Sequence, residues 1–124
     1  MRQNSYNKFL KEKKYSPTYK EGDIISKGEM LDYILNNNLS NHTGEFDYNE
    51  AKEIAYASDR WELTWINLDY FDWVCDSEYN NKSINTYPII LSCDGKYEVL
   101  DGKHRIGMYK NQGRNYALAW LGKV

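Results

Sequence analysis

The stretch Tyr97-Glu-Val-Leu-Asp-Gly-Lys-His-Arg-Ile106 decides the fold that this sequence predicts. Its first four residues alternate as in a strand, and Asp101-Gly102 then leads into a basic turn that opens a predicted helix. A helix N-terminus leaves its first amide groups without intrahelical partners and has the positive end of the helix dipole. A strand that ends at such a terminus, next to an acid, a glycine and three cations, is typical of an anion site.

The elements around this stretch form a predicted β-β-α-β unit. They are, in order, a buried strand over 87–91 with Pro88 near its start, a strand over 97–100 after an Asp94-Gly95 turn, a helix from about 103 to 112 that Gly113 ends, and a strand over 116–121. The C-terminal part of the chain therefore predicts a small sheet with a helix packed on it.

Two capping boxes predict helices further upstream. Ser26 precedes Glu29 by three residues, and Asp47 precedes Glu50 by the same spacing. The first helix places Met30, Leu31, Ile34 and Leu35 on one face and ends at 36–38; the second has a face of small residues and ends near Asp59. Residues 60–68 alternate and predict a strand, and 68–74 predict a short turn or helix. We favour core packing over base stacking for the Trp and Phe side chains there.

The length of 124 residues predicts one domain, with a basic arm over 1–22, a helical region over 23–59 and a core over 60–124. The fold class is α+β, a small mixed β-sheet with packed helices. Residues 1–20 contain six basic residues and one acidic residue, and 5–14 predict a short helix. This arm is either solvated or in contact with a phosphate backbone.

The composition excludes several classes. The net charge of −2 argues against a uniformly basic nucleic-acid binder. The start of the chain has no apolar leader and no stretch reaches membrane-spanning length, so we expect a cytoplasmic protein with no membrane partner. Cys75 and Cys93 have no metal-type spacing and are expected to be reduced.

Residues 87–121 resemble the ParB/sulfiredoxin superfamily, which includes the N-terminal domains of ParB partition proteins, sulfiredoxins and free serine kinases. The resemblance lies in the Pro-Ile-Ile strand, the Asp-Gly hairpin, the Val-Leu-Asp-Gly-x-His-Arg turn and the strand after a glycine-capped helix. A weaker likeness covers 60–75. The turn is most similar to the free serine kinase branch. Lys103 stands where sulfiredoxins have their catalytic cysteine, so that chemistry is not expected. The DNA-reading half of ParB proteins is not expected either, since the sequence stops at Val124.

The resemblance implies a site for ATP or another nucleotide with Mg²⁺. Gly102, Lys103, His104 and Arg105 would bind the phosphates, Asp101 would face the metal or the acceptor, and Asp101 and His104 would be catalytic. An upstream carboxylate would act as base, with Glu62, Asp72, Asp76 and Glu78 as the candidates. Elementary chemistry agrees, because arginine offers a planar fork of donors and glycine allows a close backbone approach.

A simpler interpretation of Asp101 is that it only caps the helix. A cap and a metal role are compatible. His104 and Arg105 are two cations in a first helical turn, where the dipole disfavours them, and this favours an anionic ligand.

Three functions remain open. The first is Mg²⁺-dependent NTP hydrolysis or phosphoryl transfer to a small acceptor. The second is a non-catalytic ParB-like module that binds protein or DNA, of the kind a phage or mobile element encodes. The third is a ParB-like nuclease, for which no cluster of carboxylates is evident in the sequence.

Overall fold

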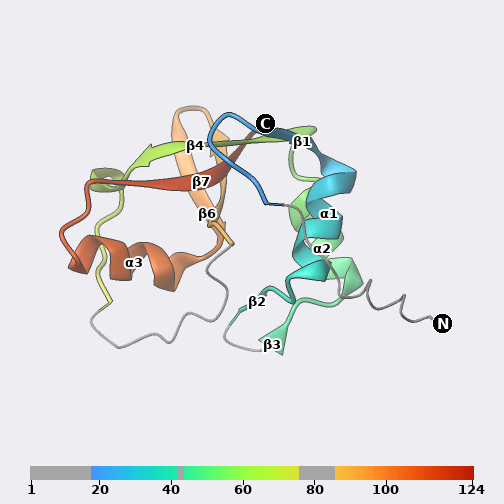
Figure 1. Ribbon diagram of the computed structural model, residues 1–124, viewed down its shortest axis with the longest axis horizontal. Coiled ribbons are helices and arrows are strands. Elements are labelled where there is room, and N and C mark those ends of the chain that lie inside the picture. Colours follow the sequence, from blue (N-terminus) through green and yellow to red (C-terminus); the bar gives the residue numbers. More distant parts are fainter. Residues whose placement is uncertain (1–17, 42–43, 76–85) are drawn as a thin grey trace.

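The computed structural model describes residues 18–41, 44–75 and 86–124, and its centre is a five-stranded mixed sheet in the order β1-β4-β7-β5-β6 (Figure 1). The elements of the main sheet are β1 (Ile24–Ser26), β4 (Arg60–Asn67), β5 (Ile89–Cys93), β6 (Lys96–Asp101) and β7 (Tyr116–Lys123). The others are α1 (Lys27–Asn36), α2 (Tyr48–Ala55), α3 (Lys103–Asn111), the 3-10 turn η1 (Leu68–Tyr70) and a small hairpin of β2 (Ser40–Asn41) and β3 (Gly44–Glu45). The predicted α+β class is confirmed.

The β-β-α-β order of the C-terminal part is also confirmed, as β5, β6, α3 and β7. Asp94 and Gly95 form the tight turn between β5 and β6 with φ values of 53° and 79°. β7 then lies between β4 and β5, antiparallel to the first and parallel to the second. Parallel neighbours need a crossover, which β6 and α3 together supply.

Both predicted capping boxes are present. The Glu29 amide donates to Ser26 Oγ at 3.1 Å and the Ser26 amide donates to Glu29 Oε1 at 2.8 Å, and Asp47 and Glu50 form the same pair of bonds. The region over 23–59 is not only helical, however, because 24–26 form the edge strand β1 against β4. Three residues are too few for an alternation signal. α2 ends at Ala55, earlier than the predicted end near Asp59.

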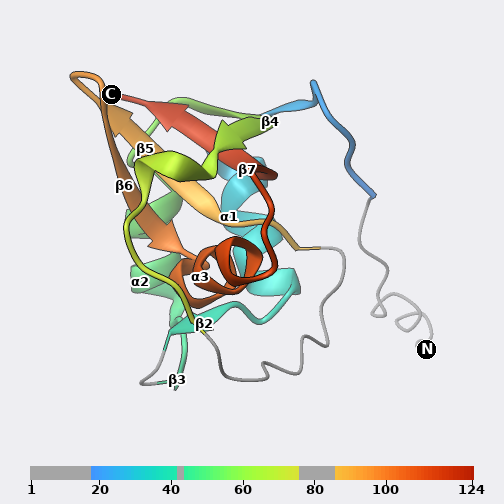
Figure 2. The ribbon, with the colours of Figure 1, turned by 90° about the vertical axis from the view of Figure 1, so that its left-hand side faces the viewer.

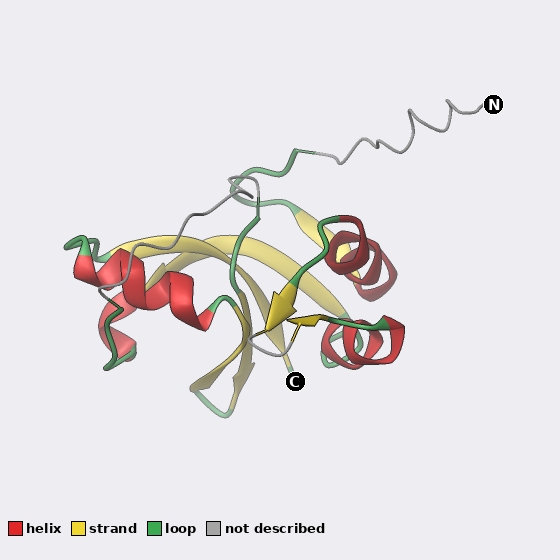
Figure 3. Ribbon diagram, turned by 90° about the horizontal axis from the view of Figure 1, so that it is seen from below, coloured by secondary structure: helices red, strands yellow, loops and turns green. Residues whose placement is uncertain are grey.

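The sheet has a cluster of buried side chains on each face, and β4 contributes to both. The α1/α2 cluster consists of Ile25, Met30, Leu31, Tyr33, Ile34, Leu39, Ala51, Ala55, Trp61, Leu63, Ile89 and Trp120. The α3 cluster consists of Ile66, Leu68, Phe71, Ile90, Ile106, Ala117 and Ala119. Figure 3 shows α3 at one end of the curved sheet and the α1–α2 pair at the other. The buried side of β4 therefore changes from one face to the other along its length.

This change explains why one aromatic prediction is wrong. Core packing is confirmed for Trp61 and Phe71, which are 0% and 3% exposed, but Trp65 is 48% exposed. Trp65 has the same strand parity as Trp61 and Leu63 and so belongs to the face of the α1/α2 cluster. The contribution of β4 to that cluster stops at Leu63, so Trp65 lies beyond the covered part.

Two further expectations concern the basic helix over 5–14 and the absence of a membrane-spanning stretch. The basic helix predicted over 5–14 lies outside them. Within them, no helix has the length and apolar character that a membrane crossing would require.

Gly122 provides a test of the packing between β7 and β4. A Cβ atom at Gly122 would lie 2.6 Å from Trp61 Cζ3 and 2.7 Å from Ser58 Cβ, so Gly122→Ala should lower the free energy of unfolding by roughly 1–3 kcal/mol through overpacking. Gly28→Ala is the control, since its nearest neighbour is Ser26 Oγ at 3.8 Å and alanine favours a helix by up to about 1 kcal/mol. Urea unfolding measures both variants. Equal stability of the two alanine variants would contradict this account of the packing.

Candidate functional site

The Asp101–Arg105 stretch does join a strand to a helix. β6 ends at Asp101 and α3 begins at Lys103, with Gly102 at the N-cap position in the left-handed conformation (φ 92°, ψ 19°). Asp101 is therefore not the helix cap, contrary to the simpler interpretation from the sequence. Gly102 has no side chain with which to cap α3, so the N-cap position offers only backbone at the positive end of the helix dipole.

The backbone of Gly102 lies directly against Pro88. A Cβ atom at Gly102 would be 2.9 Å from Pro88 Cα and 3.0 Å from Pro88 Cβ, closer than ordinary carbon contacts allow. Pro88 is itself held from the other side, because the Trp120 amide of β7 donates to its carbonyl oxygen at 2.8 Å. Residue 102 must therefore be glycine for two independent reasons, its φ angle and the space available.

Three consecutive residues before β5 form the junction that supports this turn. The Arg105 guanidinium donates from Nη1 to the carbonyl oxygen of Thr86, whose side chain is 4% exposed. The Tyr87 amide donates to the hydroxyl of Tyr33 at 2.8 Å. Thr86 is thus held by α3, Tyr87 by α1 and Pro88 by β7. The two helices α1 and α3, which are far apart in the sequence, both bind this segment.

A bulge in β6 determines where Asp101 points. Val99 pairs with Ile90, but Asp101 pairs with Ile89, so Leu100 is an extra residue in the ladder. Without it, Asp101 would share the parity of Val99 and face the α3 cluster. With it, Asp101 takes the direction of Ile89, toward the α1/α2 cluster, in keeping with the way bulges re-aim side chains.

The half-buried carboxyl group of Asp101 has a perturbed pKa. Burial raises the pKa of Asp101 to about 6, and the charge of Arg105 and a hydrogen bond with the Gly102 backbone oppose this rise. Burial also raises the pKa of Tyr33 to about 12, while the hydrogen bond from the Tyr87 amide and the charge of Arg105 lower this pKa. Asp101 and Arg105 both act on Tyr33, so the three groups form one electrostatic cluster.

This cluster changes the role expected for Arg105. Its position in the first turn of α3 suggested an anionic ligand, yet its charge already acts on the Asp101 carboxylate and its guanidinium donates to Thr86. Lys103 and His104 differ, since their side chains are exposed. The structure therefore places two of the three predicted phosphate-binding cations on the surface of the turn and one beneath it.

The segment 71–75 runs beside α3 (Figure 2), and its residues contact Lys103 and Gly107 of the helix. Trp73 Nε1 donates to the carbonyl oxygen of Lys103 at 2.9 Å, and Lys103 Nζ lies 5.1 Å from the centre of the Trp73 ring. The contact is close because residue 107 is glycine: a Cβ there would be 2.7 Å from Cys75 Sγ. Asp72, one of the candidate bases, is exposed in this segment.

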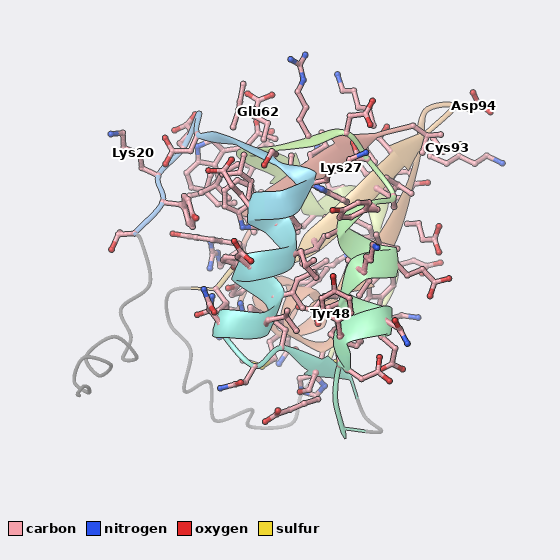
Figure 4. All side chains as sticks on the ribbon, turned by 90° about the vertical axis from the view of Figure 1, so that its right-hand side faces the viewer. Lys20, Lys27, Tyr48, Glu62, Cys93 and Asp94 are labelled. Atoms are coloured by element: carbon pink, nitrogen blue, oxygen red, sulfur yellow. The ribbon has the colours of Figure 1, made fainter. Side chains whose placement is uncertain are left out.

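Among the other candidate bases, Glu62 is not brought to Asp101. Glu62 lies on β4, three strands from β6, which is about 14 Å at a strand spacing of roughly 4.8 Å. Its parity also directs it away from the face that Asp101 shares with Ile89. Figure 4 shows Glu62 near the start of α1. Asp76 and Glu78 lie outside the described residues.

Metal-ligand chemistry at the site rests on one carboxylate. Among residues 18–41, 44–75 and 86–124, no group of three or more His, Cys, Asp or Glu residues is placed to hold a metal ion. Mg²⁺ beside phosphates needs only one or two protein carboxylates, because phosphate oxygens and water complete its shell. Asp101 fits that requirement, whereas a carboxylate cluster of the nuclease type is not found in these residues.

Tyr33, Thr86 and Trp73 are parts of the site that the sequence did not indicate. Tyr33 follows Met30 by three residues and precedes Ile34 by one, so the helical spacing contained a signal for its inward direction. Thr86 acts through its backbone carbonyl, for which a sequence has no signal.

No protein-family model, curated protein or solved structure matches this chain.

Gly102 and Gly95 form a matched pair for testing the turn. Both have positive φ, but nothing lies within 4 Å of a Cβ at Gly95, whereas Pro88 lies 2.9 Å from one at Gly102. Gly95→Ala should cost about 1–2 kcal/mol for the left-handed conformation alone. Gly102→Ala should cost roughly 2–4 kcal/mol, since overpacking adds to it. Thermal and urea unfolding measure both, and equal losses would refute the close contact with Pro88.

The pKa of Asp101 predicts a pH dependence. The carboxyl ionises at about 6 in the folded protein and at 3.8 ordinarily, so stability present below pH 4 is lost as the pH rises toward 6. The Asp101→Asn variant has no carboxyl group to ionise and so does not lose this stability. The difference in free energy of unfolding, variant minus wild type, should therefore rise between pH 4 and pH 7, by at most about 3 kcal/mol. Urea unfolding at pH 4, 5, 6 and 7 measures the difference. A difference that stays flat over this range would show that the carboxyl titrates normally.

Proposed function

We propose that this chain binds a nucleotide through its phosphates at the start of α3 and, with Mg²⁺, hydrolyses it or transfers a phosphoryl group to a small acceptor. The observation that carries this proposal is the start of α3 itself. Gly102 offers backbone without a side chain at the N-cap position, and Lys103 and His104 are exposed in the first turn of the helix. Cations at a helix N-terminus oppose the dipole, and an anion between them and the amides removes that conflict.

Each residue of the turn has a role in this proposal. Lys103 and His104 contact the phosphates, with the amides that follow Gly102. Asp101 meets Mg²⁺ or the acceptor, and Arg105 holds the turn on Thr86 while its positive charge lies beneath the phosphates. Bound Mg²⁺ would neutralise phosphate charge in the transfer step. The catalytic base is Asp72, Asp76 or Glu78, since Glu62 lies on the far side of the sheet.

The same proposal includes membership of the ParB/sulfiredoxin superfamily. It is supported by the order β5-β6-α3-β7, by the parallel pairing of β5 with β7, and by the Asp-Gly-Lys-His-Arg turn at the junction of strand and helix. Within that superfamily the turn favours the free serine kinase branch.

A second candidate is a binding module without catalysis, and exposed aromatic side chains favour it. Trp65 and Tyr116 are 48% and 53% exposed. Trp65 pairs with Leu118 and Asn67 pairs with Tyr116, so both aromatic rings lie on one sheet face at the end of β4. This surface suits a protein partner or unpaired bases.

Calorimetric titration with Mg²⁺-ATP, Mg²⁺-ADP and Mg²⁺-CTP tests the first proposal. The wild-type chain should bind at least one of them, and the double variant Lys103→Ala/His104→Ala should bind it at least about tenfold more weakly, since two charge-assisted contacts are lost. Lys96→Ala is the control, because Lys96 begins β6 while Asp101 ends it, roughly 17 Å away at 3.4 Å per residue.

The outcomes separate the candidates. If the wild-type chain binds none of the three nucleotides, the proposal of nucleotide binding is wrong. Binding that the double variant retains in full would place the nucleotide elsewhere. A protein or DNA ligand whose binding depends on Trp65 and Tyr116, or on residues 1–20, would favour the binding module.

A further inference from the structure

The Trp73 ring is fixed beside the start of α3 by contacts at its edges. Its indole N–H donates to the Lys103 carbonyl oxygen at 2.9 Å. Its Cδ1 edge lies 3.0 Å from the position of a Cβ at Gly107, so only glycine allows it to sit so close to the helix. On another side it packs on Phe71, with ring centres 5.2 Å apart and planes tilted by 58°. These contacts leave the plane of the ring little freedom.

One face of this ring is covered by the Lys103 side chain. Lys103 Nζ stands 5.1 Å from the ring centre, and the residue itself is exposed. An exposed cation–π contact is worth only about 0.5–1 kcal/mol, so an arriving flat group can displace the ammonium from the ring. A displaced Lys103 remains in the first turn of α3, beside the proposed phosphate position. The cation that covers the aromatic face is therefore also the cation expected to meet a phosphate.

We propose that Trp73 is the stacking platform for the base of the bound nucleotide, and that the base and the Lys103 ammonium exchange places when the nucleotide binds. The inference rests on the proposed function, and it adds a position for the base of the nucleotide to the proposed position of its phosphates. A base has a flat π-face that stacks on an indole whatever its hydrogen-bonding edge, so Trp73 supplies affinity without choosing between bases. The phosphates bind at the Gly102–His104 backbone, and Lys103 moves from the ring to their oxygens.

The test compares ligands that share phosphates and differ in the base. Mg²⁺-ATP, Mg²⁺-CTP and Mg²⁺ with inorganic triphosphate are titrated into the full chain of wild type, Trp73→Phe, Trp73→Ala and Tyr56→Ala. Wild type should bind a nucleoside triphosphate at least about tenfold more tightly than inorganic triphosphate, within the range measured for base stacking. The advantage should disappear in Trp73→Ala and shrink in Trp73→Phe, which retains a smaller ring.

The ratio of the two affinities is the informative quantity. Loss of the bond to the Lys103 carbonyl in a Trp73 variant can loosen α3, but that would weaken all ligands alike and leave the ratio unchanged. Tyr56→Ala is the matched control, because Tyr56 is an exposed aromatic residue at the end of α2 and a lysine also covers its ring, with Lys27 Nζ 4.9 Å from the ring centre. Its ratio should equal that of wild type.

Three results would overturn the inference. Equal affinity of wild type for nucleoside and inorganic triphosphates removes the base platform while the phosphate site stands. A ratio that stays equal to that of wild type in a folded Trp73→Ala variant, or in both Trp73 variants, places the base elsewhere. Failure of every probe to bind removes the proposed function and the platform together.

Discussion

The approach of the Gly102 backbone to Pro88 is the contact on which the start of α3 depends. It lets β6 pass into the helix without an intervening loop, because a side chain at residue 102 would meet Pro88 at 2.9 Å. From this turn, one helical turn brings Arg105 to the Thr86 carbonyl, and the first bond of α3 forms between the Ile106 amide and the Gly102 carbonyl oxygen at 3.0 Å. A shift of this turn would therefore move the helix, its cations and Asp101 together.

The junction also lies between the two hydrophobic clusters. α3 packs through Ile106 on one face of the sheet, while the β6 bulge turns Asp101 toward the other face, where Tyr33 of α1 is buried. Helix α1 is thus part of the support of the site, since the hydroxyl of Tyr33 accepts a hydrogen bond from the Tyr87 amide beside Pro88. Burial on that side raises the pKa of Asp101, and Arg105 in the first turn of α3 offsets part of the cost of burying the charge of Asp101.

The cations of the basic run have separate roles in the structure. Arg105 acts inward on Thr86 and Asp101, whereas Lys103 and His104 are exposed and Lys103 covers the ring of Trp73. The proposed phosphate site uses this division: the inward arginine keeps the turn rigid, and the backbone amides, the surface cations and the nearby aromatic ring are the groups proposed to meet the ligand.

The sequence by itself determined the local elements, since capping, alternation and turn chemistry act between residues a few positions apart. It predicted both capping boxes, the Asp94-Gly95 turn, the order of the last four elements and the strand-to-helix turn at Asp101–Arg105. Only the tertiary structure decided which residues become neighbours and which side chains are covered. It determined the bulge at Leu100, the contacts of Tyr33 and Thr86 with the turn, the exposure of Trp65, the short strand β1 and the separation of Glu62 from Asp101. These depend on strand order and on which face each helix covers, and such long-range packing leaves no signal in the spacing of neighbouring residues.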